Sequence, residues 1–169
     1  MKMSVRKLAS LAILATVALT IFVIEAALPT MIPIPGIKLG LANIVTLFVI
    51  KRYGPKEAAL VLTVRIILAT VFAGQAVSFL YSVCGGVLCL LVMSLVNWIL
   101  RGHCIALTSV FGALAHNVGQ ILAALFILKV SGILMYLPYL MISGMVTGLF
   151  TGLCTYFADR YIPQKLTRE

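Results

Sequence analysis

Long apolar runs, separated only by short polar or proline-containing stretches, dominate this chain. A helix needs about 20 mostly apolar residues to cross the hydrocarbon core of a bilayer. Six segments reach or approach that length, and they predict helices over residues 8–28, 38–52, 55–73, 77–100, 105–128 and 134–157. The pattern therefore predicts an all-α integral membrane protein, in which residues 1–169 form one bundle of six transmembrane helices.

The breaks between these segments contain residues that end or begin helices. Pro29, Pro33 and Pro35 exclude a continuous helix between the first two segments. The second segment is short, which favours a helix that starts below the membrane surface after a re-entrant loop. Rigid non-helical backbone at that depth is tolerated where it lines a cavity. The proline-rich loop is therefore either the wall or lid of a site, or a plain connector.

Composition strengthens the membrane prediction. The chain is 63% hydrophobic and 10% charged, with a mean hydropathy of +1.18, whereas a soluble domain is roughly half apolar. The first apolar run follows Lys2, Arg6 and Lys7, as in a signal peptide, but it is longer than a typical signal core. We expect it to be the first transmembrane helix of a multi-pass protein in the cell membrane.

The basic residues predict the orientation, because Lys and Arg favour cytoplasmic loops. Two of the basic residues, Lys38 and Lys129, fall on the predicted outer side, and Arg65 lies inside the third segment. The other ten fall on the opposite side: Lys2, Arg6, Lys7, Lys51, Arg52, Lys56, Arg101, Arg160, Lys165 and Arg168. Both termini are therefore predicted to be cytoplasmic. Because the net charge of +9 is spread over helix ends, we expect no nucleic-acid partner.

Polar side chains within the apolar segments are the main functional signal. Each costs on the order of 2–3 kcal/mol to insert at the centre of a bilayer. They are Glu25, Asn43, Arg65, Gln75, Asn97, His116, Asn117 and Gln120. Apart from Asn97, they fall in the middle and outer half of the predicted bundle, which suits a pocket that opens outward. The predicted substrate-binding residues are Lys38, Asn43, Arg65, Gln75, His116, Asn117 and Gln120.

Helix spacing places three of these residues together. His116 and Gln120 are four residues apart and Asn117 and Gln120 are three apart, so all three can project to one side of a helix. They either contact a ligand or form interhelical hydrogen bonds, worth about 0.6 kcal/mol each on average. Arg65 likewise either pairs with Glu25 or faces the ligand. With Lys38 at the entrance, both alternatives favour an anionic or electron-rich ligand.

Glycines spaced by four residues mark one face of the last segment, at Gly144, Gly148 and Gly152. Such small-residue patterns let helix backbones approach closely. They serve either packing inside the bundle or contact with a partner membrane protein, and we name Gly144 and Gly148 as candidate docking positions. The four cysteines form no CxxC pair and no zinc-type spacing with histidine, so we predict no metal site and no cofactor.

Several motifs resemble one known family. The run Ile34-Pro-Gly-Ile-Lys-Leu-Gly-Leu-Ala-Asn-Ile-Val-Thr46 resembles the hallmark of the Gx transporter family, also catalogued as heptaprenyl diphosphate synthase component I. The runs over residues 78–86 and 112–120 and the Tyr136-Leu-Pro sequence fit the same family, so the resemblance covers nearly the whole chain.

That family is in turn similar to the S-components of energy-coupling-factor (ECF) vitamin transporters. The resemblance implies six helices, cytoplasmic termini and an outward pocket for a small nutrient. It also implies a membrane coupling protein and cytoplasmic ATPases as partners. S-components often dock through an Ala-xxx-Ala pattern on the first helix. Here the nearest match is Ala12-xxx-Thr16, with Ala9 adjacent, and these three residues are the predicted docking face.

Two functions therefore remain open. The first is a substrate-binding membrane subunit for uptake of a nutrient or cofactor precursor, such as a vitamin. The second is a membrane accessory subunit of a polyprenyl (heptaprenyl) diphosphate synthase. The chain has four acidic residues, at positions 25, 57, 159 and 169, and no aspartate cluster that could hold magnesium on a diphosphate. It also lacks a GxxxxGK[ST] loop. We therefore expect that it is not an enzyme, and that another protein supplies any energy from ATP.

Overall fold

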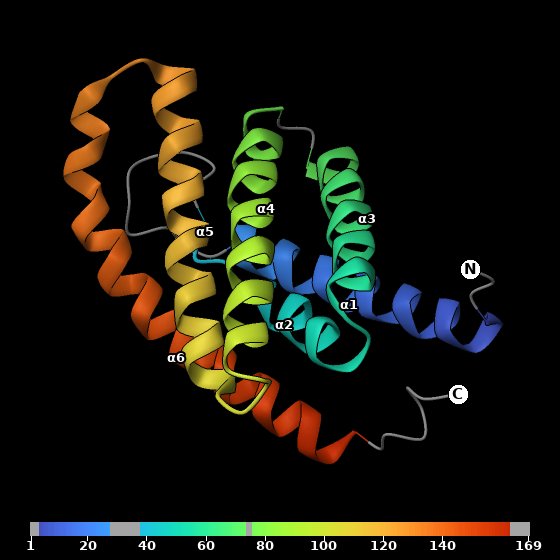
Figure 1. Ribbon diagram of the computed structural model, residues 1–169. Coiled ribbons are helices and arrows are strands. Elements are labelled where there is room, and N and C mark those ends of the chain that lie inside the picture. Colours follow the sequence, from blue (N-terminus) through green and yellow to red (C-terminus); the bar gives the residue numbers. More distant parts are fainter. Residues whose placement is uncertain (1–3, 28–37, 74–75, 163–169) are drawn as a thin grey trace.

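The computed structural model describes residues 4–27, 38–73 and 76–162. Within those ranges every regular element is a helix. The elements are α1 (Val5–Ala27), α2 (Asn43–Arg52), α3 (Pro55–Ala73), α4 (Ala76–Ile99), α5 (Ile105–Leu128), the 3-10 helix η1 (Ser131–Tyr136) and α6 (Leu137–Tyr161) (Figure 1).

Four stretches of the described chain are long and apolar enough to cross a membrane. They are Val5–Ala27, Val77–Ile99, Ile105–Leu128 and Ser131–Tyr161. Large apolar side chains on these helices, such as Trp98, Phe126 and Ile142, point outward without protein cover, as expected for contact with lipid. The protein is therefore an all-helical membrane protein. The helices α2 and α3 are not among these four stretches. The helix α2 has only ten residues, and α3 carries the charged residues Lys56, Glu57 and Arg65.

Three predicted segments begin differently in the structure. The first was expected to start at residue 8, but α1 begins at Val5. The second was expected to be helical from residue 38, but α2 starts at Asn43 because Gly40 adopts a φ of +83° that an α-helix cannot contain. The sixth was expected to start at residue 134. Instead, η1 begins at Ser131 and α6 begins at Leu137, with Pro138 in the first turn, where a proline needs no amide hydrogen.

The short helix α2 lies at the centre of the fold, in contact with α1, α3, α4, α5 and α6. Its residues from Val45 to Ile50 are all buried. In Figure 1, α4 and α5 run side by side, whereas α1 crosses behind α3 at a steep angle. The face of α1 that packs inward has buried residues every three or four positions: Leu11, Ala15, Ala18, Phe22 and Glu25. The core is thus built around α2.

Glycines allow the backbone of α5 to pack closely against α4 and α6. A Cβ atom at Gly119 would lie 2.6 Å from the carbonyl oxygen of Cys84 in α4. On the other side of α5, a Cβ at Gly148 would lie 2.7 Å from Cα of Val110, and one at Gly144 would lie 2.7 Å from Nδ2 of Asn117. The glycine face of α6 is therefore covered by α5. This corrects the expectation that Gly144 and Gly148 dock a partner protein.

Ion pairs gather three parts of the chain at one end of the bundle. Lys7 at the start of α1 pairs with Glu57 of α3 at 2.6 Å. Asp159 near the end of α6 pairs with Lys51 of α2 at 2.9 Å and also with Arg52. The first turn of α1, the α2–α3 connection and the last turn of α6 consequently lie at the same end.

Replacing Gly119 by alanine should destabilise the protein by about 1–3 kcal/mol, because the added methyl group meets the α4 backbone, which cannot move aside as a side chain can. Gly132→Ala is the matched control, because its Cβ would meet only Cγ1 of Val130 at 3.8 Å. Thermal unfolding in detergent measures both variants. Equal unfolding temperatures for the two would contradict this account of the α4–α5 contact.

Candidate functional site

Glu25, near the end of α1, holds the short loop that leads into α2, of which the structure describes residues 38–42. Its carboxylate accepts hydrogen bonds from the backbone N–H groups of Gly40 at 2.5 Å and Leu41 at 3.0 Å. The side chain is only 4% exposed. A carboxylate that accepts two N–H bonds makes strong, charge-assisted contacts, and these fix the loop inside the bundle.

His116 and Gln120 of α5 meet this loop from the opposite side. The Gln120 orientation that satisfies all its neighbours places Oε1 3.1 Å from Nε2 of His116 and 3.2 Å from the N–H of Lys38. In the same orientation Nε2 donates to the carbonyl oxygen of Lys38 at 3.0 Å. The predicted neighbours His116 and Gln120 therefore act together, and they bind the backbone of Lys38 rather than only projecting to one side.

Two glycines enclose the His116 ring. A Cβ at Gly40 would lie 2.9 Å from Cδ2 of His116, and one at Gly85 in α4 would lie 2.9 Å from Cε1 and Nδ1. Any larger residue at either position would displace the ring. These two glycines are site residues that the sequence-based selection missed. The Gly85-Gly86 pair inside an apolar segment was the signal available in the sequence, whereas the φ of +83° at Gly40 is seen only in the structure.

Buried polar atoms around His116 are left without partners. Within the described residues, neither side-chain atom of Asn43, nor Nδ1 of His116, nor Oδ1 of Asn117 has a hydrogen bond. Asn117 uses its Nδ2 to donate to the carbonyl oxygen of Leu140 in α6 at 2.6 Å. Buried polar groups are nearly always paired in native proteins. The unpaired atoms therefore mark a site that could accept a polar ligand.

Two cations of the same region lie over the face of the Phe22 ring in α1. Nζ of Lys38 lies 3.2 Å from the ring centroid and the guanidinium carbon of Arg65 lies 5.8 Å from it. Arg65 is 3% exposed, and its Nε has no partner in the described part of the chain. Phe22 gave no signal in the sequence, because a phenylalanine in an apolar run looks like any other lipid-facing or core residue.

The structure shows how Arg65 lies relative to Glu25. Among the described residues, no direct ion pair joins Arg65 to Glu25, whose oxygens accept from the loop backbone. Attraction between the two charges remains. Arg65 is thus attracted to Glu25 but keeps unused donor capacity. Of the predicted substrate-binding residues, Gln75 lies outside the described ranges.

The predicted docking residues of α1 lie on its outer face. Ala9, Ala12 and Thr16 are all exposed. The Thr16 hydroxyl donates to the carbonyl oxygen of Ala12 at 3.0 Å, so its polar group is satisfied within the helix and its methyl group remains available for contact. Asn97, the remaining polar residue of the apolar segments, lies at the far end of α4, away from His116.

Comparison with known proteins identifies the family. The model for heptaprenyl diphosphate synthase component I matches residues 14–158. The chain belongs to this family. The match includes every described residue of the polar site, from Phe22 to Gln120. No curated protein and no solved structure matches the chain.

Glu25→Gln should destabilise the protein by about 1–3 kcal/mol, because an amide oxygen accepts more weakly and the amide nitrogen would face an N–H group. Glu57→Gln is the matched control: it removes the same charge from the ion pair with Lys7 near the surface, where about 1 kcal/mol or less is expected. Thermal unfolding of both variants tests the difference. An equal loss in the two variants would show that Glu25 does not hold the loop.

Proposed function

We propose that this protein is a substrate-binding membrane subunit that takes up a small nutrient or cofactor precursor. One observation carries the proposal: buried polar atoms from α2, α3 and α5 have no hydrogen-bond partner among the described residues, and the side chains of Asn43 and His116 lie beside Gly40, in the loop held by Glu25. Leaving a buried donor or acceptor without a partner costs about 1–3 kcal/mol. A ligand with both donors and acceptors would recover part of that cost.

Charge supports an anionic or electron-rich ligand. Lys38 and Arg65 bring two positive charges to the region and Glu25 brings one negative charge. The carboxylate is already engaged with two backbone N–H groups. The positive charges are therefore more available to a ligand than the negative one.

The proposed topology has six membrane passes with both termini on the cytoplasmic side. The ion pairs support it, because they place the start of α1 and the end of α6 at one end of the bundle together with the basic α2–α3 connection. In this topology α2 supplies half of a pass and the loop before it supplies the rest. That arrangement requires internal partners for the loop backbone, and Glu25 and Gln120 provide them.

In this proposal a separate coupling protein and ATPases supply the energy, since the sequence contains no GxxxxGK[ST] loop. The outer face of α1, with Ala9, Ala12 and Thr16, is the surface we assign to that coupling protein. Small exposed residues on an apolar helix allow another helix to approach closely.

A second candidate function follows from the family description. A membrane accessory subunit of a heptaprenyl diphosphate synthase would bind the other synthase component at its cytoplasmic end. The exposed basic residues Lys56 and Arg101 at that end favour an acidic partner there. This function assigns no role to the unpaired polar atoms near His116.

Native mass spectrometry of the gently solubilised protein separates the two candidates. A small molecule should co-purify with the wild type and be lost in His116→Ala, Asn43→Ala and Asn117→Ala. Asn43 and Asn117 form a matched pair, because both changes remove the same atoms. Asn43→Ala should cost less stability than Asn117→Ala by about 1 kcal/mol, since only Asn117 loses a hydrogen bond in the empty protein.

An empty wild type with a polyprenyl synthase attached would replace the transport proposal by the accessory function. A small molecule that all three variants retain would show that the polar region is structural only.

Cysteine labelling tests the proposed topology. In a protein whose other cysteines are changed to serine, Cys104, exposed beside the α4–α5 turn, should be protected from an impermeant maleimide added to intact cells. A Lys129→Cys change at the end of α5 should be labelled under the same conditions. Labelling of Cys104 from outside would reverse the proposed orientation.

A further inference from the structure

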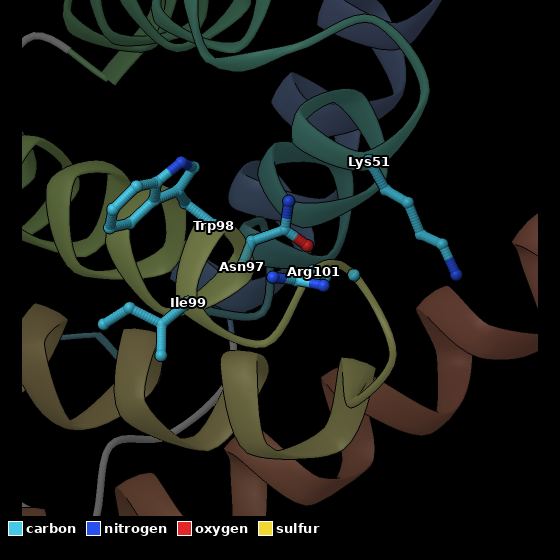
Figure 2. Close-up of a pocket in the computed structure, with 6 residues that line it drawn as sticks. Lys51, Asn97, Trp98, Ile99 and Arg101 are labelled. Atoms are coloured by element: carbon cyan, nitrogen blue, oxygen red, sulfur yellow. The ribbon is translucent and has the colours of Figure 1, made fainter.

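A second polar region lies at the opposite end of α2 from the His116 site. It is an open pocket of about 840 Å³ lined by Lys51, Asn97, Trp98, Ile99, Arg101 and Gly102. Figure 2 shows Asn97 and Arg101 between Lys51, which comes from α2, and Trp98 of α4. The pocket thus combines the Arg101 guanidinium and an amide with two large apolar side chains, and the side chain of Lys51 extends away from them to pair with Asp159.

The backbone at the end of α4 fixes the position of Arg101. The residue has a φ of +49°, and the following Gly102 has a φ of +74° and donates its N–H to the carbonyl oxygen of Asn97 at 3.0 Å. The N–H of Arg101 donates to the carbonyl oxygen of Trp98 at 3.2 Å. This is a left-handed helix cap, in which the last carbonyl groups are satisfied locally. The guanidinium therefore starts from a defined backbone position at the rim of the pocket.

Arg101 carries the charge of the pocket that no acid of the described chain neutralises. Lys51, on the other side of the pocket, pairs with Asp159 at 2.9 Å. Arg101 is exposed and forms no ion pair within the described residues. The positive charge of Arg101 therefore remains open to an anion.

An apolar stripe leads away from the pocket along α4. Leu91, Leu95, Trp98 and Ile99 recur every three or four residues and are all exposed, Trp98 to 76%. Tryptophan favours the boundary between headgroups and hydrocarbon, where its ring can meet both. Basic residues next to that boundary attract anionic lipids. A molecule with an anionic head and a long apolar tail could therefore place its head in the pocket beside Arg101 and its tail along the apolar stripe of α4.

We propose that this pocket binds the phosphate-bearing headgroup of an amphiphilic lipid whose apolar chain lies along α4. Arg101 contacts the phosphate oxygens, Asn97 donates a further hydrogen bond, and Trp98 and Ile99 cover the start of the chain. Two sources share this chemistry: an acidic phospholipid of the bilayer and a prenyl diphosphate. The site is separate from the polar region around His116 and does not depend on the transport proposal.

The test titrates the full-length protein in detergent with phosphatidylglycerol, farnesyl diphosphate and inorganic pyrophosphate, with phosphatidylcholine as the neutral reference, and reads bound species by native mass spectrometry. Arg101→Gln should weaken binding of the anionic lipids about tenfold, because it removes a charge-assisted hydrogen bond. Arg101→Lys keeps the charge and should retain most of the binding. Arg160→Gln is the matched control, since it removes one positive charge from the same end of the bundle outside the pocket.

The comparison between ligands identifies the source. Tighter binding of phosphatidylglycerol assigns the pocket to a bilayer phospholipid, and tighter binding of farnesyl diphosphate assigns it to a prenyl diphosphate. Trp98→Ala should weaken the binding of both lipids but not that of pyrophosphate.

An equal loss of binding in Arg101→Gln and Arg160→Gln would overturn the proposal in favour of diffuse charge attraction. Pyrophosphate that binds as tightly as the lipids would overturn the role of the apolar chain. Because Arg101 is exposed, unfolding temperatures of its variants should match the wild type.

Discussion

The carboxylate of Glu25 is the interaction on which the rest of the structure depends. Irregular backbone inside a membrane protein must find hydrogen-bond partners within the protein, because hydrocarbon offers none. Glu25 supplies two acceptor atoms for the N–H groups of Gly40 and Leu41, and Gln120 binds the backbone of Lys38. With its backbone satisfied, the loop can remain inside the bundle, and α2 can start below the surface. The polar region around His116 depends on this loop, because Gly40, which the Glu25 carboxylate holds, is buried beside the His116 ring.

Close contact of helix backbones is the second requirement of the architecture. Gly119 allows α5 to reach α4, and Gly148 allows α6 to reach α5. In a bilayer, helix association depends on such packing and on a few interhelical hydrogen bonds rather than on the hydrophobic effect. The contact between the Ser109 and Thr151 hydroxyls at 2.6 Å and the bond from Asn117 to the Leu140 carbonyl are of this kind. They hold one wall of the polar region in place.

The two polar regions differ in the exposure of the side chains that could bind a ligand. Near His116, the side chains are buried and their free atoms face the interior, which suits a small ligand enclosed by protein. At the end of α4, Arg101 and Trp98 are exposed, which suits a lipid that enters from the bilayer. The short helix α2 connects them, with Asn43 at one end and Lys51 at the other. The family description names a component of heptaprenyl diphosphate synthase, and the buried polar atoms are a feature that this description does not contain.

The amino-acid sequence by itself determined the helical character of the chain, its membrane environment and the family, because apolar run length and local motifs carry that information. It also marked Asn43, Arg65, His116, Asn117 and Gln120 as unusual, because polar residues in apolar runs are costly wherever the helices pack.

Only the tertiary structure decided which contacts these residues make. Glu25 binds loop backbone instead of pairing directly with Arg65, Gly144 and Gly148 face α5 instead of a partner, and Phe22, Gly40 and Gly85 join the site. These outcomes depend on contacts between residues far apart in the chain, and periodicity within one helix cannot specify which neighbour its face will meet.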